Sequence, residues 1–397
     1  MRTLIVIGLL ASVITAAPGA EQLSVAQLEL KLDSSLKKVA SVSPEHSQDN
    51  QFKDIDIDTS VLRDAAEDSQ LATQLYRVEL TERLTPKTLE RMVAKEKPGL
   101  ETMRALEFLR DRSASLDPPQ SEWVVLGSPD AESQKHALEL ARAYVSQSLQ
   151  RLPNFFATRT TTSLASLPQL RGELVLPNAE EPRLEGTSVL EITFRDGKEY
   201  VAPTQTAGTV NVPADSGLAS QGEFGPEAAT VLMDLANQIN GTATFNHWEA
   251  TPAGLAAVYR YSVAAGGSHY EVQYACKAKV AFHAFPGYHG SIAIRQATGA
   301  ILRITVAADW NPKDPISHVT SAIEYGPVAI GDRAYICPLK SFATMAIEAD
   351  VCARHGNARR LTKPEMMLNR TTFSDYHRLG STVTIVPAEK DDKQGPG

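Results

Sequence analysis

The fold is decided by the stretch Tyr288–Phe342, which reads YHGSIAIRQATGAILRITVAADWNPKDPISHVTSAIEYGPVAIGDRAYICPLKSF. Within Leu302–Val306, apolar residues alternate with polar ones, and this period of two is typical of a strand with one buried face. Gly or Asp, which tight turns require, separates the runs at Ala297–Gly299, Gly326-Pro327 and Gly331-Asp332. The stretch therefore predicts an antiparallel β-meander.

Three further strands precede the meander in the sequence. Their β-branched and aromatic residues predict them at Thr244–Glu249, Leu255–Val263 and His269–Cys276. Gly266-Gly267 predicts a hairpin turn between the last two strands. We therefore expect these segments to extend the sheet of the meander.

Helical and extended patterns alternate farther upstream. Ser128-Pro129 begins a predicted helix that ends at Pro153, and the aromatic and threonine-rich residues after it favour a strand. Val189–Ala202 predicts a hairpin, and Pro226–Ile239 predicts an amphipathic helix.

The N-terminal region predicts a bundle of helices. Ser24–Val39 combines a capping box with apolar residues at helical spacing. Two more helices are expected to end near Leu80 and Lys95, and another begins at Leu100. Region 21–113 is therefore predicted to be a small helical module.

The first residues predict the compartment. Residues 1–20 have the layout of a secretory signal peptide, with Arg2, an apolar run over Leu4–Ile14, and small residues before Ala20. The run is shorter than the roughly 20 apolar residues that span a bilayer. We therefore expect an exported protein, periplasmic or extracellular, whose mature chain has no transmembrane anchor.

Composition restricts the classes of partner. The 397 residues are 43% hydrophobic and 22% charged, which is typical of globular proteins, and the net charge is -8. This acidic balance disfavours nucleic acid as a general partner, because phosphates are bound by clustered basic residues.

The three cysteines leave two alternatives open. Cys276 and Cys337 both lie in predicted strands, so in an oxidising compartment they could form a disulfide and leave Cys352 as a thiol. The alternative is three buried thiols.

Two sets of short sequence segments resemble known proteins. Leu149–Ala157 is similar to the join between the helix and the first strand of periplasmic lipoprotein carriers, and Gly299–Arg303 and Tyr325–Gly331 resemble their later hairpins. These carriers have a half-barrel fold. The resemblance implies a concave sheet faced by a helix, with an apolar cavity for an acyl chain or a hydrophobic peptide segment.

A second resemblance covers more of the chain. Four segments are similar to sequences in a family of exported bacterial proteins of unknown function. They are Glu79–Leu84, His269–Val272, Phe285–Gly290 and Tyr335–Pro338. This resemblance implies export and carries no activity.

We therefore expect an α+β protein with a curved, half-barrel-like antiparallel sheet and packed helices. The expected organisation is a signal peptide at 1–20, the helical module at 21–113, a connector at 114–128, the half-barrel-like domain at 129–348, and a largely irregular tail at 349–397.

Aromatic residues in the β region are the candidate ligand-binding residues. Those expected to line or rim a cavity are Trp248, Tyr259, Tyr261, Tyr270, Tyr274, Phe285, Tyr288 and His289. The alternative is that the aromatic side chains form the core of the sheet. Phe285–Gly290 is the best candidate for a functional loop at the rim.

No motif in the sequence carries catalytic chemistry. Five histidines lie between 247 and 318, namely His247, His269, His283, His289 and His318, but none has the spacing of a known zinc motif. We expect no metal, no cofactor and no catalytic residue.

Three functions follow, in order of preference. The first is a non-enzymatic binding protein for a hydrophobic ligand, such as a lipid, an acyl chain or a lipoprotein segment. The second is a cell-envelope interaction or scaffold protein with a filled core. The third is a hydrolase that uses a histidine with a carboxylate and a nucleophile.

Overall fold

The structure is a computed structural model, and it describes residues 21–41, 59–166, 169–170, 181–195, 198–201, 243–276, 279–311, 313–350 and 359–380. The predicted signal peptide at 1–20, the predicted helix at 226–239 and the end of the predicted tail at 381–397 lie outside the described residues.

The N-terminal module consists of helices and a short parallel sheet. Its elements are β1 (Glu21–Leu23), α1 (Val25–Ser41), α2 (Thr59–Tyr76), β2 (Val78–Leu80), α3 (Pro86–Glu96) and α4 (Leu100–Arg112). Leu28, Leu75, Met92 and Leu106, one from each helix, are fully buried in a common core. These four helices therefore share one core.

The starts of two helices in the module have identifiable caps. Thr85 accepts a hydrogen bond from the backbone N–H of Thr88 and precedes Pro86, as the sequence predicts for α3. The N-cap of α4 is Gly99, which has no side chain, and Asp68 of α2 accepts the N–H groups of Glu101 and Thr102 instead, at 2.9 and 3.1 Å. A single carboxylate therefore holds α2 against α4.

One helix boundary in the module was predicted wrongly. The helix expected to end near Leu80 ends at Tyr76, and Val78–Leu80 forms β2, which pairs in parallel with β1. This pairing joins residues far apart in the sequence, so local helical spacing gave no sign of it.

The rest of the described chain forms an open, curved sheet with one long helix. The elements are η1 (Gln120–Glu122), α5 (Ala131–Arg151), β3 (Phe155–Ala165), β4 (Gln169–Leu170), β5 (Arg183–Arg195), β6 (Lys198–Val201), β7 (Thr244–Thr251), β8 (Gly254–Val263), η2 (Ala265–Gly267), β9 (Val272–Cys276), β10 (Lys279–Ala284), β11 (Tyr288–Ile294), β12 (Ile301–Ala308), β13 (Ile316–Ile330), β14 (Arg333–Asp350) and β15 (Arg359–Arg378). The strand order is β6-β5-β3-β15-β14-β13-β12-β11-β8-β7, and β4 pairs with β15 in the same eleven-stranded sheet. All pairings within this sheet are antiparallel. The predicted α+β class with a curved antiparallel sheet is confirmed.

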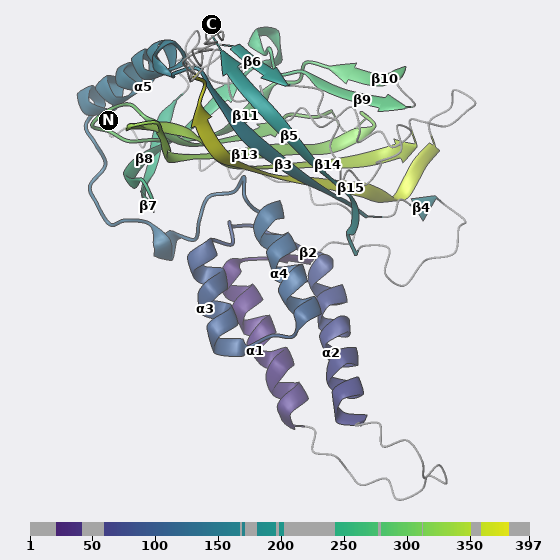
Figure 1. Ribbon diagram of the computed structural model, residues 1–397. Helices are drawn as coiled ribbons and strands as arrows, with labels where there is room; N and C mark the ends of the chain where they lie inside the picture. The colour runs from purple at the N-terminus through teal and green to yellow at the C-terminus, as the bar shows by residue number, and fades with distance from the viewer. Residues whose placement is uncertain are drawn as a thin grey trace, which may run out of the picture.

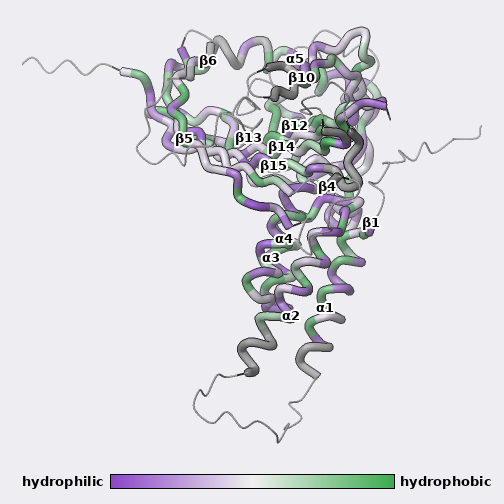
Figure 2. The backbone as a smooth tube through the Cα atoms, turned by 90° about the vertical axis from the view of Figure 1, so that its right-hand side faces the viewer, coloured by the Kyte–Doolittle hydropathy of each residue, from purple (hydrophilic) through white to green (hydrophobic). Residues whose placement is uncertain are grey.

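The two faces of this sheet carry different helices (Figure 1). We call the face that packs against α5 the inner face, and the face toward the helical module the outer face. Both views show α1–α4 standing away from the outer face, with α5 on the opposite side (Figures 1 and 2). Leu368 of β15 joins the core of the helical module, and Phe342 of β14 packs with Ala114, so the module is attached to the central strands.

Helix α5 lies close against the inner face. Ala137 and Ala141 belong to the same buried cluster as Tyr259, Tyr288 and other inner-face residues. In the β11–β12 turn Gly299 approaches the backbone of α5, where an added Cβ would lie 2.3 Å from the carbonyl carbon of Leu140. Small residues on both sides therefore permit the close contact.

The prediction of a largely irregular tail at 349–397 is wrong for residues 359–378. These residues form β15, a central strand between β14 and β3. Polar residues such as Asn369 and Thr371 made the segment look irregular, although both are buried on the inner face.

Two turns were also predicted wrongly. Gly326-Pro327 lies within β13, beside an irregularity in register, and the reversal of the chain comes later at Gly331, which has a φ of 68°. Gly266-Gly267 does not join paired strands, because β8 pairs with β7 and β11 while β9 pairs with β10 in a separate two-stranded sheet.

A glycine substitution tests the contact between α5 and the sheet. Gly299→Ala should destabilise the protein by roughly 3 kcal/mol or more, because it adds a steric clash to the cost of a positive φ of 71°. Gly331→Ala is the matched control, since its φ is 68° and the nearest atom is 3.6 Å from the added Cβ, so only about 1–2 kcal/mol should be lost. Chemical denaturation measures both, and equal losses would show that α5 does not pack tightly on the turn.

Candidate functional site

Five of the predicted ligand-binding aromatic residues lie in one packed cluster. They are Trp248, Tyr259, Tyr261, Tyr270 and Tyr288, and they join aliphatic residues of the inner face and the two alanines of α5. Tyr259, Tyr270 and Tyr288 are at most 1% exposed. The part of the inner face beneath α5 is therefore filled by side chains, as the alternative interpretation of the sequence expected.

Polar groups in this cluster are held in different ways. The Tyr261 hydroxyl donates to the Thr305 carbonyl at 2.6 Å, and Trp248 Nε1 donates to the Gly127 carbonyl at 3.0 Å. The Tyr259 hydroxyl is buried without a hydrogen-bond partner, and burial raises its pKa to about 12. Tyr259 therefore remains neutral and acts as a packing residue.

Two of the other predicted residues, Phe285 and His289, lie outside this cluster. Phe285 is 48% exposed and contacts the His283 ring edge to face, while His289 is exposed and pairs with Asp309. The side chain of Tyr274 lies outside the described residues. The structure therefore does not bring all eight predicted residues together.

A different part of the inner face has a floor of small side chains. Ser321, Ala343, Asn369, Ser163 and Gly186 lie side by side in register across β13, β14, β15, β3 and β5. A second row beside the first contains Ser341, Thr371, Thr161 and Ser188 across β14, β15, β3 and β5. We call these two rows the small-residue floor.

The small-residue floor has different neighbours on its two sides. On one side Val319, Met345 and Met367 lie in register and belong to the cluster beneath α5. On the other side the next residue of β3 on this face is Arg159, which is buried, and Phe155 and Phe194 stack at 5.2 Å farther along in a smaller cluster. The floor therefore lies between an apolar region and a buried guanidinium group.

Two polar atoms of the floor have no partner. Ser321 Oγ and Asn369 Oδ1 are buried without a hydrogen bond, and the two residues are 4% and 5% exposed. In contrast, the hydroxyls of Thr161 and Thr371 bond to each other at 3.0 Å. A buried polar atom without a partner costs about 1–3 kcal/mol, so Ser321 Oγ and Asn369 Oδ1, like the Tyr259 hydroxyl, are polar atoms that the described residues leave unsatisfied.

Histidines of the β region pair with carboxylates. His283 Nε2 lies 2.9 Å from Glu271, and His289 Nδ1 lies 2.8 Å from Asp309. No serine, threonine or cysteine is bonded to either ring in the part of the chain that the structure describes. The pairs lack the nucleophile that the hydrolase hypothesis requires. The described residues also contain no cluster of three or more metal-ligating side chains.

A buried ion-pair cluster joins the helical module to the sheet. Arg83, which follows β2, donates to Glu249 of β7 at 2.5 Å, and Arg303 of β12 donates to the other carboxylate oxygen at 3.2 Å. His247 lies beside them, and its ring stacks on Trp123 at 4.4 Å between ring centroids. Burial raises the pKa of Glu249, but His247 and Arg83 stabilise the carboxylate more strongly and hold its pKa below the usual value.

The connector wraps around the edge strand β7 next to this cluster. On the outer face Trp123 stacks on His247, and on the inner face Gly127 accepts the Trp248 indole N–H. At the edge itself, Val124 donates a backbone hydrogen bond to the Trp248 carbonyl at 2.9 Å. The connector therefore leads the chain from the outer face to α5 on the inner face.

The suggested disulfide between Cys276 and Cys337 is not formed in the structure. Cys337 is a free thiol, 1% exposed, in the apolar cluster of Phe155 and Phe194. Burial raises its pKa to about 12, so the reactive thiolate is suppressed. The side chain of Cys276 lies outside the described residues.

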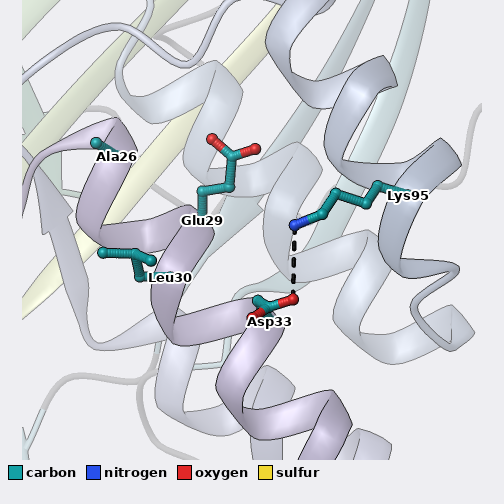
Figure 3. A pocket seen from close by; sticks show the side chains of 5 residues that line it. All are labelled: Ala26, Glu29, Leu30, Asp33 and Lys95. Carbon is teal, nitrogen blue, oxygen red and sulfur yellow. Dashed lines mark ion pairs between the residues drawn. The ribbon is translucent and has the colours of Figure 1, made fainter.

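A groove of about 330 Å³ lies between α1 and α3 of the helical module (Figure 3). Its lining residues are Ala26, Glu29, Leu30, Asp33 and Lys95. Asp33 pairs with Lys37 and Lys95, and Glu29 pairs with Arg91. Because these charges are already paired, the groove gives no sign of a ligand.

Comparisons with known proteins add little. No protein-family model matches the chain, and no curated protein matches its sequence. Among solved structures, the chain is similar to the crystal structure of a LolA superfamily protein from Nitrosomonas europaea, with a TM-score of 0.22 and 9% identity over 62% of this chain and 94% of that chain. A likeness at this level carries no argument about function.

None of the described helices is long and apolar enough to span a membrane.

A substitution in the ion-pair cluster tests what holds the module to the sheet. Glu249→Gln should lower the free energy of unfolding by about 3–5 kcal/mol at pH 7, because it leaves two buried guanidinium groups without their carboxylate. The depressed pKa of Glu249 contributes stability above the unfolded pKa of about 4.3, and this stability is lost as the pH falls through the lower folded value. The difference between wild type and variant should therefore shrink below about pH 4.3.

Arg260→Gln is the control for this measurement. Arg260 pairs with Asp117 at the same junction but is 61% exposed, so its loss should cost less than about 1 kcal/mol. Similar losses for the two variants would contradict the central role of Glu249.

Proposed function

We propose that the protein is a non-enzymatic binding protein that holds a largely hydrophobic, amphipathic ligand across the inner face of the sheet. The observation that carries the proposal is the small-residue floor with its two unpartnered polar atoms, Ser321 Oγ and Asn369 Oδ1. The ligand lies on this floor and not among the aromatic residues beneath α5, which already fill their space.

The dimensions of the floor suit an extended ligand. Its first row crosses five neighbouring strands, from β13 to β5, which span about 19 Å at the usual spacing between strands. An extended acyl chain or a peptide segment of about five or six residues has this length. None of the residues in the floor has a large side chain that would obstruct such a ligand.

The chemistry of the floor defines the ligand further. Asn369 Oδ1 accepts hydrogen bonds, and the Ser321 hydroxyl donates or accepts them. Met345 and Met367 beside the floor favour hydrocarbon. The ligand therefore combines an apolar body with an N–H or O–H group, as in a lipid with a hydroxylated head or a lipoprotein segment.

Burial along the floor is uneven. Ser321, Asn369 and Gly186 are buried, whereas Ser163 and Ser188 are half-buried. We also propose that residues 1–20 direct export, which places the protein in the periplasm or outside the cell.

A second candidate is a scaffold or interaction protein of the cell envelope whose core is filled. The packed tyrosines beneath α5 favour it, because they occupy the place where the sequence predicted a ligand. In this case the floor has no ligand, and the helical module carries the contact with a partner protein.

Native mass spectrometry of protein purified from its own host tests the proposed function. The spectra should contain a complex of the polypeptide with a lipid-like or peptide ligand, and a mature N-terminus near Gly19 or Ala20 would report export. Recovery of the bare polypeptide alone would favour the scaffold.

A pair of variants tests the site. Ser321→Ala should reduce the ratio of ligand-bound to bare protein roughly five-fold, since one hydrogen bond contributes about 1 kcal/mol. The same variant should leave the free energy of unfolding of ligand-free protein unchanged or slightly raised, because the hydroxyl has no partner there.

Thr344→Val is the matched control on the outer face of β14. Its hydroxyl is bonded to Thr320 at 2.7 Å, so the substitution should lower the free energy of unfolding by about 1 kcal/mol and leave ligand binding unchanged. A Ser321→Ala variant that loses stability and keeps its ligand would contradict the assignment.

A further inference from the structure

The two unpartnered oxygen atoms of the small-residue floor lie in the same row but on different strands. Ser321 of β13 is in register with Ala343 of β14, which is in register with Asn369 of β15. Ser321 is 4% exposed and Asn369 5%, and neither Ser321 Oγ nor Asn369 Oδ1 has a hydrogen-bond partner. The row therefore presents two buried oxygen atoms with an alanine between them.

The spacing of these two residues restricts the ligand. Neighbouring strands lie about 4.8 Å apart, so two strand spacings place the Cα atoms of Ser321 and Asn369 about 10 Å apart. Both side chains are short, and a donor lies about 3 Å from the oxygen that accepts its hydrogen bond. The two oxygens therefore call for two polar groups of the ligand. The group at Asn369 is a donor, because a carbonyl oxygen only accepts.

An extended peptide presents polar groups at a suitable spacing. Its backbone N–H groups point to the same side at every second residue, which is a repeat of about 7 Å. Inclination of the Ser321 and Asn369 side chains toward each other covers the remaining distance of about 3 Å. In contrast, a fatty acid carries its polar atoms at one end only, so it satisfies one of the two oxygens.

The neighbouring rows suit the side chains of such a peptide. When its N–H groups face the floor, its side chains point along the floor, alternately to one side and to the other. One side carries Met345 and Met367, whose flexible thioethers adapt to varied apolar partners. The other side carries the hydroxyls of Ser341 and Thr371. A peptide that alternates apolar and polar residues matches both sides.

We infer that the small-residue floor binds an extended peptide segment that crosses β13, β14 and β15. The backbone of the peptide bonds to Ser321 and Asn369, its apolar side chains contact Met345 and Met367, and its polar side chains face the second row. This inference rests on the proposed function, since it names the class of ligand for the same floor.

Affinity selection with a defined mixture of peptides tests this inference. The probe is a mixture of peptides of about seven residues with blocked ends, which alternate valine, leucine or methionine with serine or threonine. The full chain should retain a subset of these peptides, which mass spectrometry identifies. Retention of palmitate but of no peptide would overturn the inference and leave the proposed function standing. Retention of neither probe would count against both.

Two variants decide whether the oxygens make separate contacts. Ser321→Ala and Asn369→Ala should each weaken binding of a retained peptide roughly five-fold, and the double variant roughly 25-fold, because independent contacts add. Palmitate should lose no more in the double variant than in the more affected single variant. A double variant that binds the peptide as well as either single variant would overturn the inference. Chemical denaturation of each variant without a probe checks that its fold is intact.

Replacement of one peptide amide by an ester gives a matched test on the side of the probe. The ester removes a single N–H donor and keeps the extended shape. At one position it should weaken binding to wild-type protein roughly five-fold and leave binding to Asn369→Ala unchanged, because the acceptor is absent there. Thr344→Val, with its substitution on the outer face, should respond like wild type. Equal losses for wild type and Asn369→Ala at every position would contradict the contact.

Discussion

The attachment of the connector to both sides of the edge strand β7 is the constraint on which the rest of the structure depends. His247 and Glu249 hold Trp123 and Arg83 on the outer face, while Trp248 between them bonds to Gly127 on the inner face. Because successive side chains of a strand point to opposite faces, three consecutive residues fix the helical module on one side and the start of α5 on the other. The position of α5 in turn decides which part of the inner face is filled.

The division of the inner face explains why binding is assigned to one region and packing to another. Beneath α5, large aromatic side chains pack with aliphatic residues and with two alanines of the helix. Across β14, β15 and β3, small residues such as Ala343 and Ser163 occupy the same face. A ligand is expected where side chains are short and polar atoms lack partners, and this region lies outside the set of aromatic residues that the sequence singled out.

The sequence predicted the elements whose signals are local. Alternation in Leu302–Val306 predicted β12, and Thr85-Pro86 predicted the start of α3. The sequence missed β15, because Asn369 and Thr371 are polar residues that look exposed and reveal their burial only when β14 and β3 pair on either side. The small-residue floor could not be predicted for the same reason, since it depends on the register of strands that are distant in the chain. The bond from Trp248 to Gly127 likewise joins residues too far apart for any sequence pattern to report.

The most direct test is a high-resolution crystal structure of the protein purified from its own host, inspected above Ser321, Ala343 and Asn369. We expect continuous non-protein density along the floor, with a ligand atom within about 3.2 Å of both Ser321 Oγ and Asn369 Oδ1. Density for the protein's own side chains on the floor, with both polar atoms bonded to them, would contradict the assignment of this face to ligand binding.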